Sequence, residues 1–405
     1  MKSLLLFLLS AICTWGSAFT DGEGIQFVKP LTQLLDRVAT EYYSQIDSWN
    51  LLDYGGMLEN TLVDLETGQF LDTENYQSRI YIPVDSKELS ALCATGTNRF
   101  YLAYYDGDRQ CMGCEILLVT GGQLLHLPQG CNYVSISAED ELLSETIFVQ
   151  EGGENVFLVS KEDTMYSSIK KAVAQVEEKG VILVFPGTYK ENIKAWGKNI
   201  TIIGTDAQEC ILVSYSASYY APPLEIGAGE VRNLTIQAKG AGSVSNPGAY
   251  GVHVEDNYLY DNTLIFADCI IESDSNSAVG MGMRGGCEVV FSHCVLTGKE
   301  DGLFCHDGAY KKYTGVQNLT MEDCIIEGKK GGYAIRFDSQ GVTGARINVK
   351  FVNNTLINNN NRNGKYIQTR NNGGRGGEEN WMGLKNYYLD PESHGNNAEE
   401  MNYNQ

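Results

Sequence analysis

Short apolar or alternating runs, separated by turn residues, fill the first third of the chain. Asp106-Gly107 and Gly121-Gly122 each follow one of these runs, which cover residues 78–83, 99–105, 115–119 and 132–137. Strands of this length at short intervals are typical of two packed β-sheets. The pattern therefore predicts a small β-sandwich domain over residues 19–155.

The hydrophobic period changes at residues 165–180. Ile169, Ala172, Val173 and Val176 follow the i, i+3, i+4, i+7 spacing of one helix face, and Gly180 supplies a stop signal. We expect one amphipathic helix here. Two apolar strands follow at residues 181–185 and 199–204, so the helix opens a second domain.

A short motif then recurs along the chain. It begins at Phe266, Phe291, Met321 and Phe351, at intervals of 25, 30 and 30 residues. An internal repeat of this size predicts a solenoid, and apolar positions with Gly or Asn at the corners fit a parallel β-helix. Three residues after each start lie Cys269, Cys294, Cys324 and Asn354, so we expect the three thiols to stack inside the coils. Metal ligation or nucleophilic chemistry is the alternative, which their core positions disfavour.

Composition narrows the classes of function. Hydrophobic residues make up 43% of the 405 residues, which excludes general disorder, and the formal charge of −21 disfavours nucleic acid as a partner. The 24 tyrosines supply flat rings of the kind that bind sugars or protein surfaces.

Residues 1–18 have the pattern of a signal peptide. Lys2 precedes an apolar run over residues 4–15, and the small residues Gly16 and Ala18 follow it. A membrane anchor is the alternative, but the run is shorter than the ~20 residues that cross a bilayer. No later segment is apolar enough to span a membrane, so we expect a secreted or cell-surface protein.

Cysteine spacing gives one further candidate site. Cys111-Met-Gly-Cys114 has the spacing of a redox pair or of half a zinc site, but no second such pair follows. A disulfide or two buried thiols in a loop is the interpretation that the sequence favours. No metal site is predicted from cysteines.

The N-terminal strands carry a first resemblance. With an Ile-Pro-Val strand at 82–84, a Tyr-Tyr-Asp-Gly turn at 104–107 and a strand at 132–137, they resemble the β-sandwich modules that precede β-helices in phage tail and bacterial surface proteins. The resemblance implies an attachment or glycan-binding module, with a structural collar as the alternative.

The second domain carries a more specific resemblance. Residues 166–173, 186–193 and 198–204, including the G-x-Y-x-E motif at Gly187, Tyr189 and Glu191, resemble the opening of the pectin methylesterase family. The likeness runs from about residue 160 to 340. It implies a right-handed parallel β-helix, which we place at residues 156–358, with an Asn/Gly-rich cap or tail at 359–405.

The resemblance also implies candidate catalytic residues. The family's G-Y-Q-D-T-L-Y segment matches residues 298–304, so its general acid/base is Asp301, and Glu300 replaces a glutamine. Ser277 replaces the oxyanion-binding glutamine. The aspartate nucleophile falls on Gly331 or Gly332, so the site is degenerate, unless a bulge carries Asp338 into it.

Other roles for these residues stay open. Glu300 and Asp301 could bind calcium together with Asp307, Asp338 or His306, although adjacent carboxylates on a strand point to opposite faces. Lys299, Arg284 and Arg336 could serve a lyase, and a solvated coil corner is the simplest alternative. No other cofactor is indicated.

Three functions therefore remain. The sequence favours a carbohydrate-recognising surface or tail-spike-like protein, in which Tyr219, Tyr220, His306 and Arg336 contact a polysaccharide or surface glycan beside Asp301. An active polysaccharide esterase or lyase and a purely structural β-helix are the alternatives. The negative charge predicts a neutral, methylated or calcium-bridged ligand.

Overall fold

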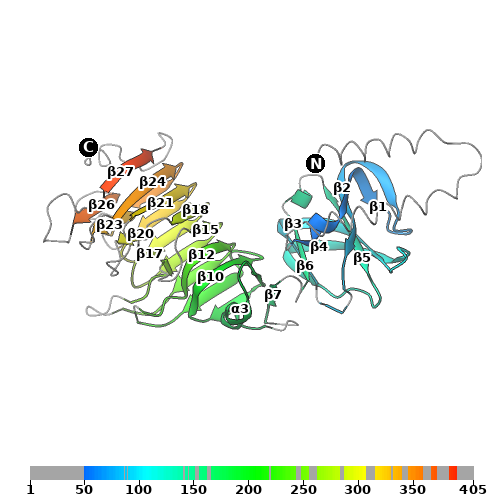
Figure 1. Ribbon diagram of the computed structural model, residues 1–405, viewed down its shortest axis with the longest axis horizontal. Helices are drawn as coiled ribbons and strands as arrows, with labels where there is room; N and C mark the ends of the chain where they lie inside the picture. The colour runs from blue at the N-terminus through cyan, green and yellow to red at the C-terminus, as the bar shows by residue number, and fades with distance from the viewer. Residues whose placement is uncertain are drawn as a thin grey trace, which may run out of the picture. The chain divides into compact units, whose positions relative to one another are not determined.

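The computed structural model consists of an antiparallel β-sheet followed by a parallel β-helix (Figure 1). It describes residues 50–389 except 86, 89, 140–141, 145, 151–154, 162–165, 219, 243–247, 255–261, 283–286, 307–314, 330–331, 340–344, 359–365 and 372–382. The expected signal peptide, Tyr219, Arg284, Asp307 and Gly331 lie outside the described residues.

The antiparallel sheet contains every strand predicted in the first third of the chain. Its strands are β1 (Gly56–Val63), β2 (Phe70–Pro83), β3 (Ser90–Tyr105), β4 (Cys111–Leu125), β5 (Tyr133–Glu139) and β6 (Ile147–Gln150), and two short 3₁₀ helices, η1 (Leu51–Tyr54) and η2 (Leu142–Ser144), lie beside them. The order is β1-β2-β5-β3-β4, and β6 pairs with β3.

The long strand β3 changes partner along its length. Ser90–Cys93 pairs with β6, and Tyr101–Tyr105 pairs with β5. Phe100, Leu102 and Ile136 are fully buried and belong to the core of this sheet. The described strands form one hydrogen-bonded sheet, so the antiparallel β region is observed but a division into two sheets is not.

The predicted amphipathic helix is α3 (Ile169–Gln175). The Ser168 hydroxyl oxygen accepts a hydrogen bond from the Lys171 amide, as at a regular helix N-terminus, and Ile169, Ala172 and Val173 are buried. Glu191 Oε2 accepts a further bond from the Lys170 amide at 2.7 Å. The G-x-Y-x-E motif thus holds the helix onto the first coil, which is a structural role.

The coils of the β-helix have three faces. The first strands of the β-helix are β7 (Val156–Val159), β8 (Val181–Val184), β10 (Ile193–Gly204) and β12 (Leu224–Arg232). Face 1 then contains β14 (Val252–Val254), β17 (Val279–Gly282), β20 (Leu303–His306), β23 (Ile335–Ser339) and β26 (Ile367–Asn371). Face 2 contains β15 (Thr263–Ala267), β18 (Glu288–Ser292), β21 (Gly315–Glu322), β24 (Ala345–Val352) and β27 (Gly383–Leu389).

Face 3 forms a separate parallel sheet. It contains β9 (Gly187–Lys190), β11 (Cys210–Ser214), β13 (Thr235–Ala238), β16 (Ile270–Ser273), β19 (Val295–Gly298), β22 (Ile325–Gly328) and β25 (Thr355–Asn358). Faces 1 and 2 share one sheet because β12 pairs with β14 through Leu224–Glu225 and with β15 through Gly229–Arg232.

These pairings confirm the fold class predicted from the sequence, an all-β chain with a parallel β-helix. Pairing changes from antiparallel to parallel between β6 and β7. At the other end, β26 and β27 continue the ladders past residue 358, so the coils extend further than predicted. Among the described residues, no helix is long and apolar enough to cross a membrane.

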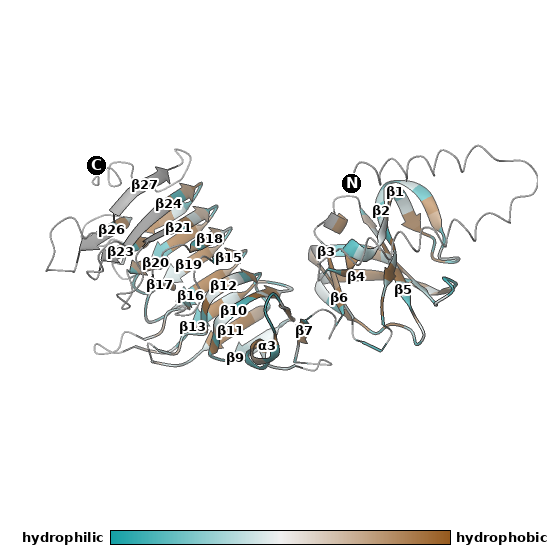
Figure 2. Ribbon diagram, viewed as in Figure 1, coloured by the Kyte–Doolittle hydropathy of each residue, from teal (hydrophilic) through white to brown (hydrophobic). Residues whose placement is uncertain are grey.

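The repeated motif forms the inner stack between faces 2 and 3. Phe266, Phe291, Met321 and Phe351 occupy one register position on successive coils. Cys269, Cys294 and Cys324 are 1% exposed, and each thiol donates to a backbone carbonyl of its own coil and of the coil before. The predicted thiol ladder is therefore confirmed. Figure 2 shows apolar residues concentrated on the coil strands.

Candidate functional site

The side chains that point outward from face 1 form one continuous row. In β20, Leu303 and Cys305 point into the core, so Phe304 and His306 point outward. The strand register places Phe304 in line with residues of the neighbouring coils. The row consists of Lys194, Glu225, His253, Gly280, Phe304 and Arg336.

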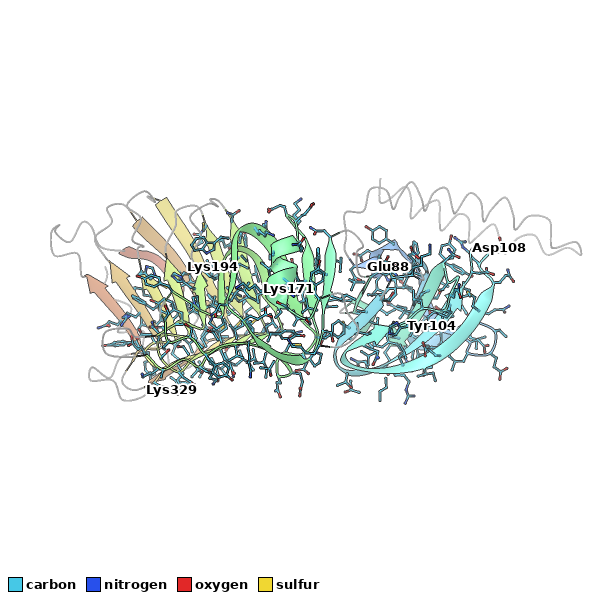
Figure 3. All side chains as sticks on the ribbon, turned by 90° about the horizontal axis from the view of Figure 1, so that it is seen from below. Glu88, Tyr104, Asp108, Lys171, Lys194 and Lys329 are labelled. Atoms are coloured by element: carbon cyan, nitrogen blue, oxygen red, sulfur yellow. The ribbon has the colours of Figure 1, made fainter. Side chains whose placement is uncertain are left out.

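Most of this row is shielded from solvent. Glu225 is 6% exposed and Phe304 is 8% exposed, and His306, one step along the same strand, is 5% exposed. On face 3 the outward residue Ile325 is 43% exposed. Lys194, labelled in Figure 3, and Arg336 reach solvent, with side chains 55% and 19% exposed. The row is thus a sheltered surface that opens at two points.

Aromatic rings connect the members of the row. The buried Tyr250 ring lies 5.4 Å from the His253 ring and 6.5 Å from the Phe304 ring. A Cβ atom at Gly280 would overlap the Tyr250 ring, so the glycine lets this ring lie against β17. His306 stacks with His253 at 6.2 Å and lies 5.3 Å from Phe304.

Asp301 lies at the turn before β20 and is 1% exposed. Its Oδ2 atom is 3.2 Å from Arg336 Nη1 and accepts a hydrogen bond from Ser277 Oγ at 3.3 Å. Its Oδ1 atom accepts a bond from the Tyr333 amide at 3.0 Å. Burial raises the pKa of Asp301, although the Arg336 guanidinium opposes this shift.

Arg336 also lies over a ring of the row. Its guanidinium carbon is 3.9 Å from the centroid of Phe304, a cation–π contact. One side chain therefore links the acid of the predicted catalytic motif to the aromatic row. Three residues predicted separately from sequence, Asp301, Arg336 and His306, come together in this way around Phe304.

Glu300 is half-buried next to Asp301. Burial raises the pKa of Glu300, the Arg336 charge lowers it, and the Asp301 charge raises it again. The charge of the adjacent Lys299 also lowers this pKa, but burial has the largest effect and the pKa stays above its usual value. The structure therefore places two carboxyl groups with raised pKa values side by side.

Tyr333 lies opposite Asp301 on the next coil. Leu303 pairs with Ile335, so Asp301 faces Tyr333 two residues earlier, and the Gly302 amide donates to the Tyr333 carbonyl. A Cβ atom at Gly332 would overlap the Glu300 carbonyl oxygen. Gly332 therefore serves close backbone packing, and the assignment of the nucleophile position to Gly331 or Gly332 stays a prediction.

The remaining predicted residues are less central. Asp338 pairs with His306 in an uninterrupted register from Ile335, so the bulge that would carry it toward Asp301 is absent from the described strand. Tyr220 is 81% exposed on the turn before β12, outside the row.

The described residues include no group of three or more His, Cys, Asp or Glu that could hold a metal ion. Calcium binding stays a prediction, because Asp307 and the Asp338 side chain are not described.

Sequence reasoning missed the other end of the row. Glu225 Oε2 is 3.4 Å from Lys194 Nζ, and Glu225 Oε1 is 3.3 Å from His253 Nδ1. Lys194 Nζ also lies 4.5 Å from the Trp196 ring centroid. The sequence did contain a signal for these residues, since each polar residue stands between two apolar ones, at 193–195, 224–226 and 252–254. Only the strand register shows that the three polar residues align on neighbouring coils.

No family model matches the chain, and no curated protein matches it. Matches among solved structures include pectin methylesterase from carrot, with 16% identity over 59% of this chain and 90% of that chain and a TM-score of 0.35. Pectin methylesterase PemA from Erwinia chrysanthemi is 12% identical over 57% and 92% of the two chains, with a TM-score of 0.30. The catalytic domain of a GH87 α-1,3-glucanase is 12% identical over 78% and 72%, with a TM-score of 0.31. The strand register described above, and not these superpositions, establishes the fold.

Proposed function

We propose that face 1 of the β-helix binds a polysaccharide or surface glycan, with Phe304 and Arg336, at one end of the row, as its main contacts. The observation that carries this proposal is the continuous row of rings and charged groups over neighbouring coils. Aromatic rings offer flat apolar surfaces, and a few fixed polar groups provide orientation, which is the usual composition of a ligand site. Other outward positions, such as Ile325 on face 3, lack this combination.

Recognition fits the site better than ester hydrolysis of the pectin methylesterase type. That chemistry needs one carboxylate to attack and a second to move the proton. The register puts Tyr333 opposite Asp301, and the Asp301 carboxyl is held by Arg336, Ser277 and the Tyr333 amide. A carboxyl held by three partners is arranged to orient Arg336 toward a ligand.

An active polysaccharide esterase or lyase is the second candidate. The raised pKa values of Asp301 and Glu300 favour it, because an upward shift makes a carboxyl better suited to act as a general acid. The signal-peptide pattern of residues 1–18 supports an exported or surface-bound binding protein and argues against a phage virion protein. The resemblance of the N-terminal strands to attachment modules is what supports a tail-spike-like role.

The charge of the chain limits the ligand. With a formal charge of −21, the protein repels polyanions at long range. The ligand is therefore neutral, methyl-esterified or bridged by calcium. Tight binding to polygalacturonate in the presence of a chelator would contradict this part of the proposal.

A glycan array followed by titration calorimetry tests the proposal. Phe304→Ala removes the ring beneath the Arg336 guanidinium, and Arg336→Lys keeps the charge but not the flat guanidinium, so we expect each to weaken binding about 10-fold. Lys329→Ala, which removes an exposed cation at the end of β22 (Figure 3), is the matched control and leaves affinity unchanged. Absence of binding to any glycan, or equal affinity of all three variants, would overturn the proposal.

A further inference from the structure

The thiols of Cys111 and Cys114 lie next to each other at the start of β4. Their Sγ atoms are 3.5 Å apart, Cys111 is exposed, and Cys114 is partly exposed. The other eight cysteines among the described residues are buried. Figure 3 marks this region by Tyr104, near the end of β3, and Asp108, in the turn that leads into β4.

A β-bulge explains why these two side chains meet. Residues three apart on a regular strand point to opposite faces of the sheet. Here Tyr104 pairs with Gly113 and Tyr105 pairs with Cys111, so Met112 is an extra residue in the ladder. The extra residue turns Cys111 to the same side as Cys114, which is the local effect of a bulge.

The turn between β1 and β2 is shaped to contact the thiol pair. Gly68 adopts φ +67°, and a Cβ atom on it would overlap Cys111 Sγ. The Cys114 thiol donates to the Asp64 carbonyl, with Sγ 3.6 Å from the oxygen, and the Tyr105 hydroxyl donates to the Gly68 carbonyl. The thiols thus occupy a defined place between two hairpins while Cys111 stays open to solvent.

We propose that Cys111 and Cys114 are a redox-active dithiol that low-molecular-weight disulfides oxidise to an intramolecular disulfide. The two sulfurs need to approach by about 1.5 Å to reach bonding distance, which is ~2.05 Å. Two side chains can supply this movement by rotation about χ1.

The order of reaction follows from exposure. The Cys111 thiolate attacks one sulfur of the small disulfide, forms a mixed disulfide and releases one thiolate. Cys114 then loses its proton to the medium and attacks the Cys111 sulfur, which releases the second thiolate. The two protein thiols are oxidised by two electrons, and the small disulfide is reduced to two thiols. Burial and the neighbouring Cys111 raise the pKa of Cys114 to about 12, which agrees with Cys111 as the first nucleophile.

A zinc site is the competing use of such a pair. Zinc in proteins takes four ligands in structural sites and at least three protein ligands in catalytic ones. Near Cys111 and Cys114 the described residues supply no third ligand that would complete a group. The dithiol chemistry needs no further residue.

Peptide mapping of the full-length protein tests the proposal. The reduced protein is incubated with oxidised glutathione, free thiols are blocked with N-ethylmaleimide, and the digest is analysed by mass spectrometry. We expect the peptide with Cys111 and Cys114 to lose two hydrogens and to carry no label, and dithiothreitol to reverse both changes. Labelled Cys111 and Cys114 after this treatment would overturn the proposal, as would tight retention of zinc that blocks both thiols.

Variants separate the steps. Cys114→Ser accumulates the mixed disulfide with glutathione at Cys111, and Cys111→Ser reacts more than tenfold more slowly. Deletion of Met112 removes the bulge and leaves the two cysteines two residues apart on a regular strand. Their Cβ atoms are then separated by about 6.8 Å, beyond the ~3.5–4.5 Å of a disulfide, so no intramolecular disulfide forms although both thiols remain. Met112→Ala is the matched control and still forms it. If the deletion variant does not fold, the absence of a mixed disulfide in Cys114→Ser is the result that overturns the proposal.

Discussion

Arg336 forms an ion pair with Asp301 across neighbouring coils, with Nη1 and Oδ2 separated by 3.2 Å. The pair is uneven, because Asp301 is 1% exposed whereas the Arg336 side chain is 19% exposed. Moving a carboxylate out of water costs free energy that a partly solvated cation offsets only in part. This explains why the pKa of Asp301 is raised despite its partner.

The raised pKa predicts how Asp301 affects stability at different pH values. The pKa of an aspartate in the unfolded chain is ~3.9, below that of folded Asp301. The folded state therefore holds its proton more tightly, and this contribution to stability is complete below pH ~3.9 and is lost as pH rises through the folded pKa. Asp301→Asn cannot ionise, so its stability relative to the wild type should increase from pH 4 to pH 7.

Urea unfolding of both proteins at the two pH values measures this difference. Asp274→Asn, which changes a side chain that is 59% exposed, is the control and should show a much smaller change. If Asp301→Asn instead loses stability relative to the wild type as pH rises, the ion pair with Arg336 dominates burial, and our account of the site is wrong.

Gly280 and Tyr250 should be coupled. Gly280→Ala places a methyl group where the Tyr250 ring lies, and overpacking of this kind costs about 1–3 kcal/mol. In a Tyr250→Ala background the same methyl group enters space that the ring has left, so its cost should disappear. Thermal or urea unfolding of the four proteins in this double-mutant cycle gives the coupling free energy. Additive effects of the two substitutions would mean that the ring does not lie against β17.

The register of face 1 can be tested at Gly332 and Tyr333. Gly332→Asp forces a side chain into the Glu300 carbonyl, so we expect a loss of about 3 kcal/mol or more in unfolding free energy. Tyr333→Asp changes a partly exposed side chain and should cost less, although it adds a carboxylate near Asp301. Urea unfolding curves of the wild type and of both variants give the two losses of unfolding free energy to be compared. A Gly332→Asp protein as stable as the wild type would show that Gly332 does not pack against the Glu300 carbonyl.

Sequence alone identified the coils because each one reuses the same short turn. Asp268, His293 and Asp323 all adopt φ between 51° and 53°, immediately before the cysteines of the ladder. A local requirement that recurs with each coil leaves a repeat that can be recognised. The helix α3 was predictable for a similar reason, since its buried positions lie within one short segment.

The row on face 1 produces no comparable repeat in the sequence. Glu225 and His253 are 28 positions apart, and the spacing between coils differs along the chain, so their alignment depends on loop lengths. The same uncertainty affects the nucleophile position, which the sequence assigned to Gly331 or Gly332. Positions set by local turns could be predicted, whereas positions set by counting across loops could not.

Pectin methylesterase activity should be absent or very weak. The covalent step needs a carboxylate that attacks the ester, and the register places Tyr333 where Asp301 would need such a partner. Loss of a member of a catalytic unit can lower the rate on the order of a million-fold. Methanol release from methyl-esterified pectin by the purified protein, by Asp301→Ala and by Asp338→Ala measures this. We expect all three to stay at the background rate, because Asp338 pairs with His306 and not with Asp301. Robust turnover that either substitution abolishes would show that the site is catalytic and that Asp301 or Asp338 acts on the ester.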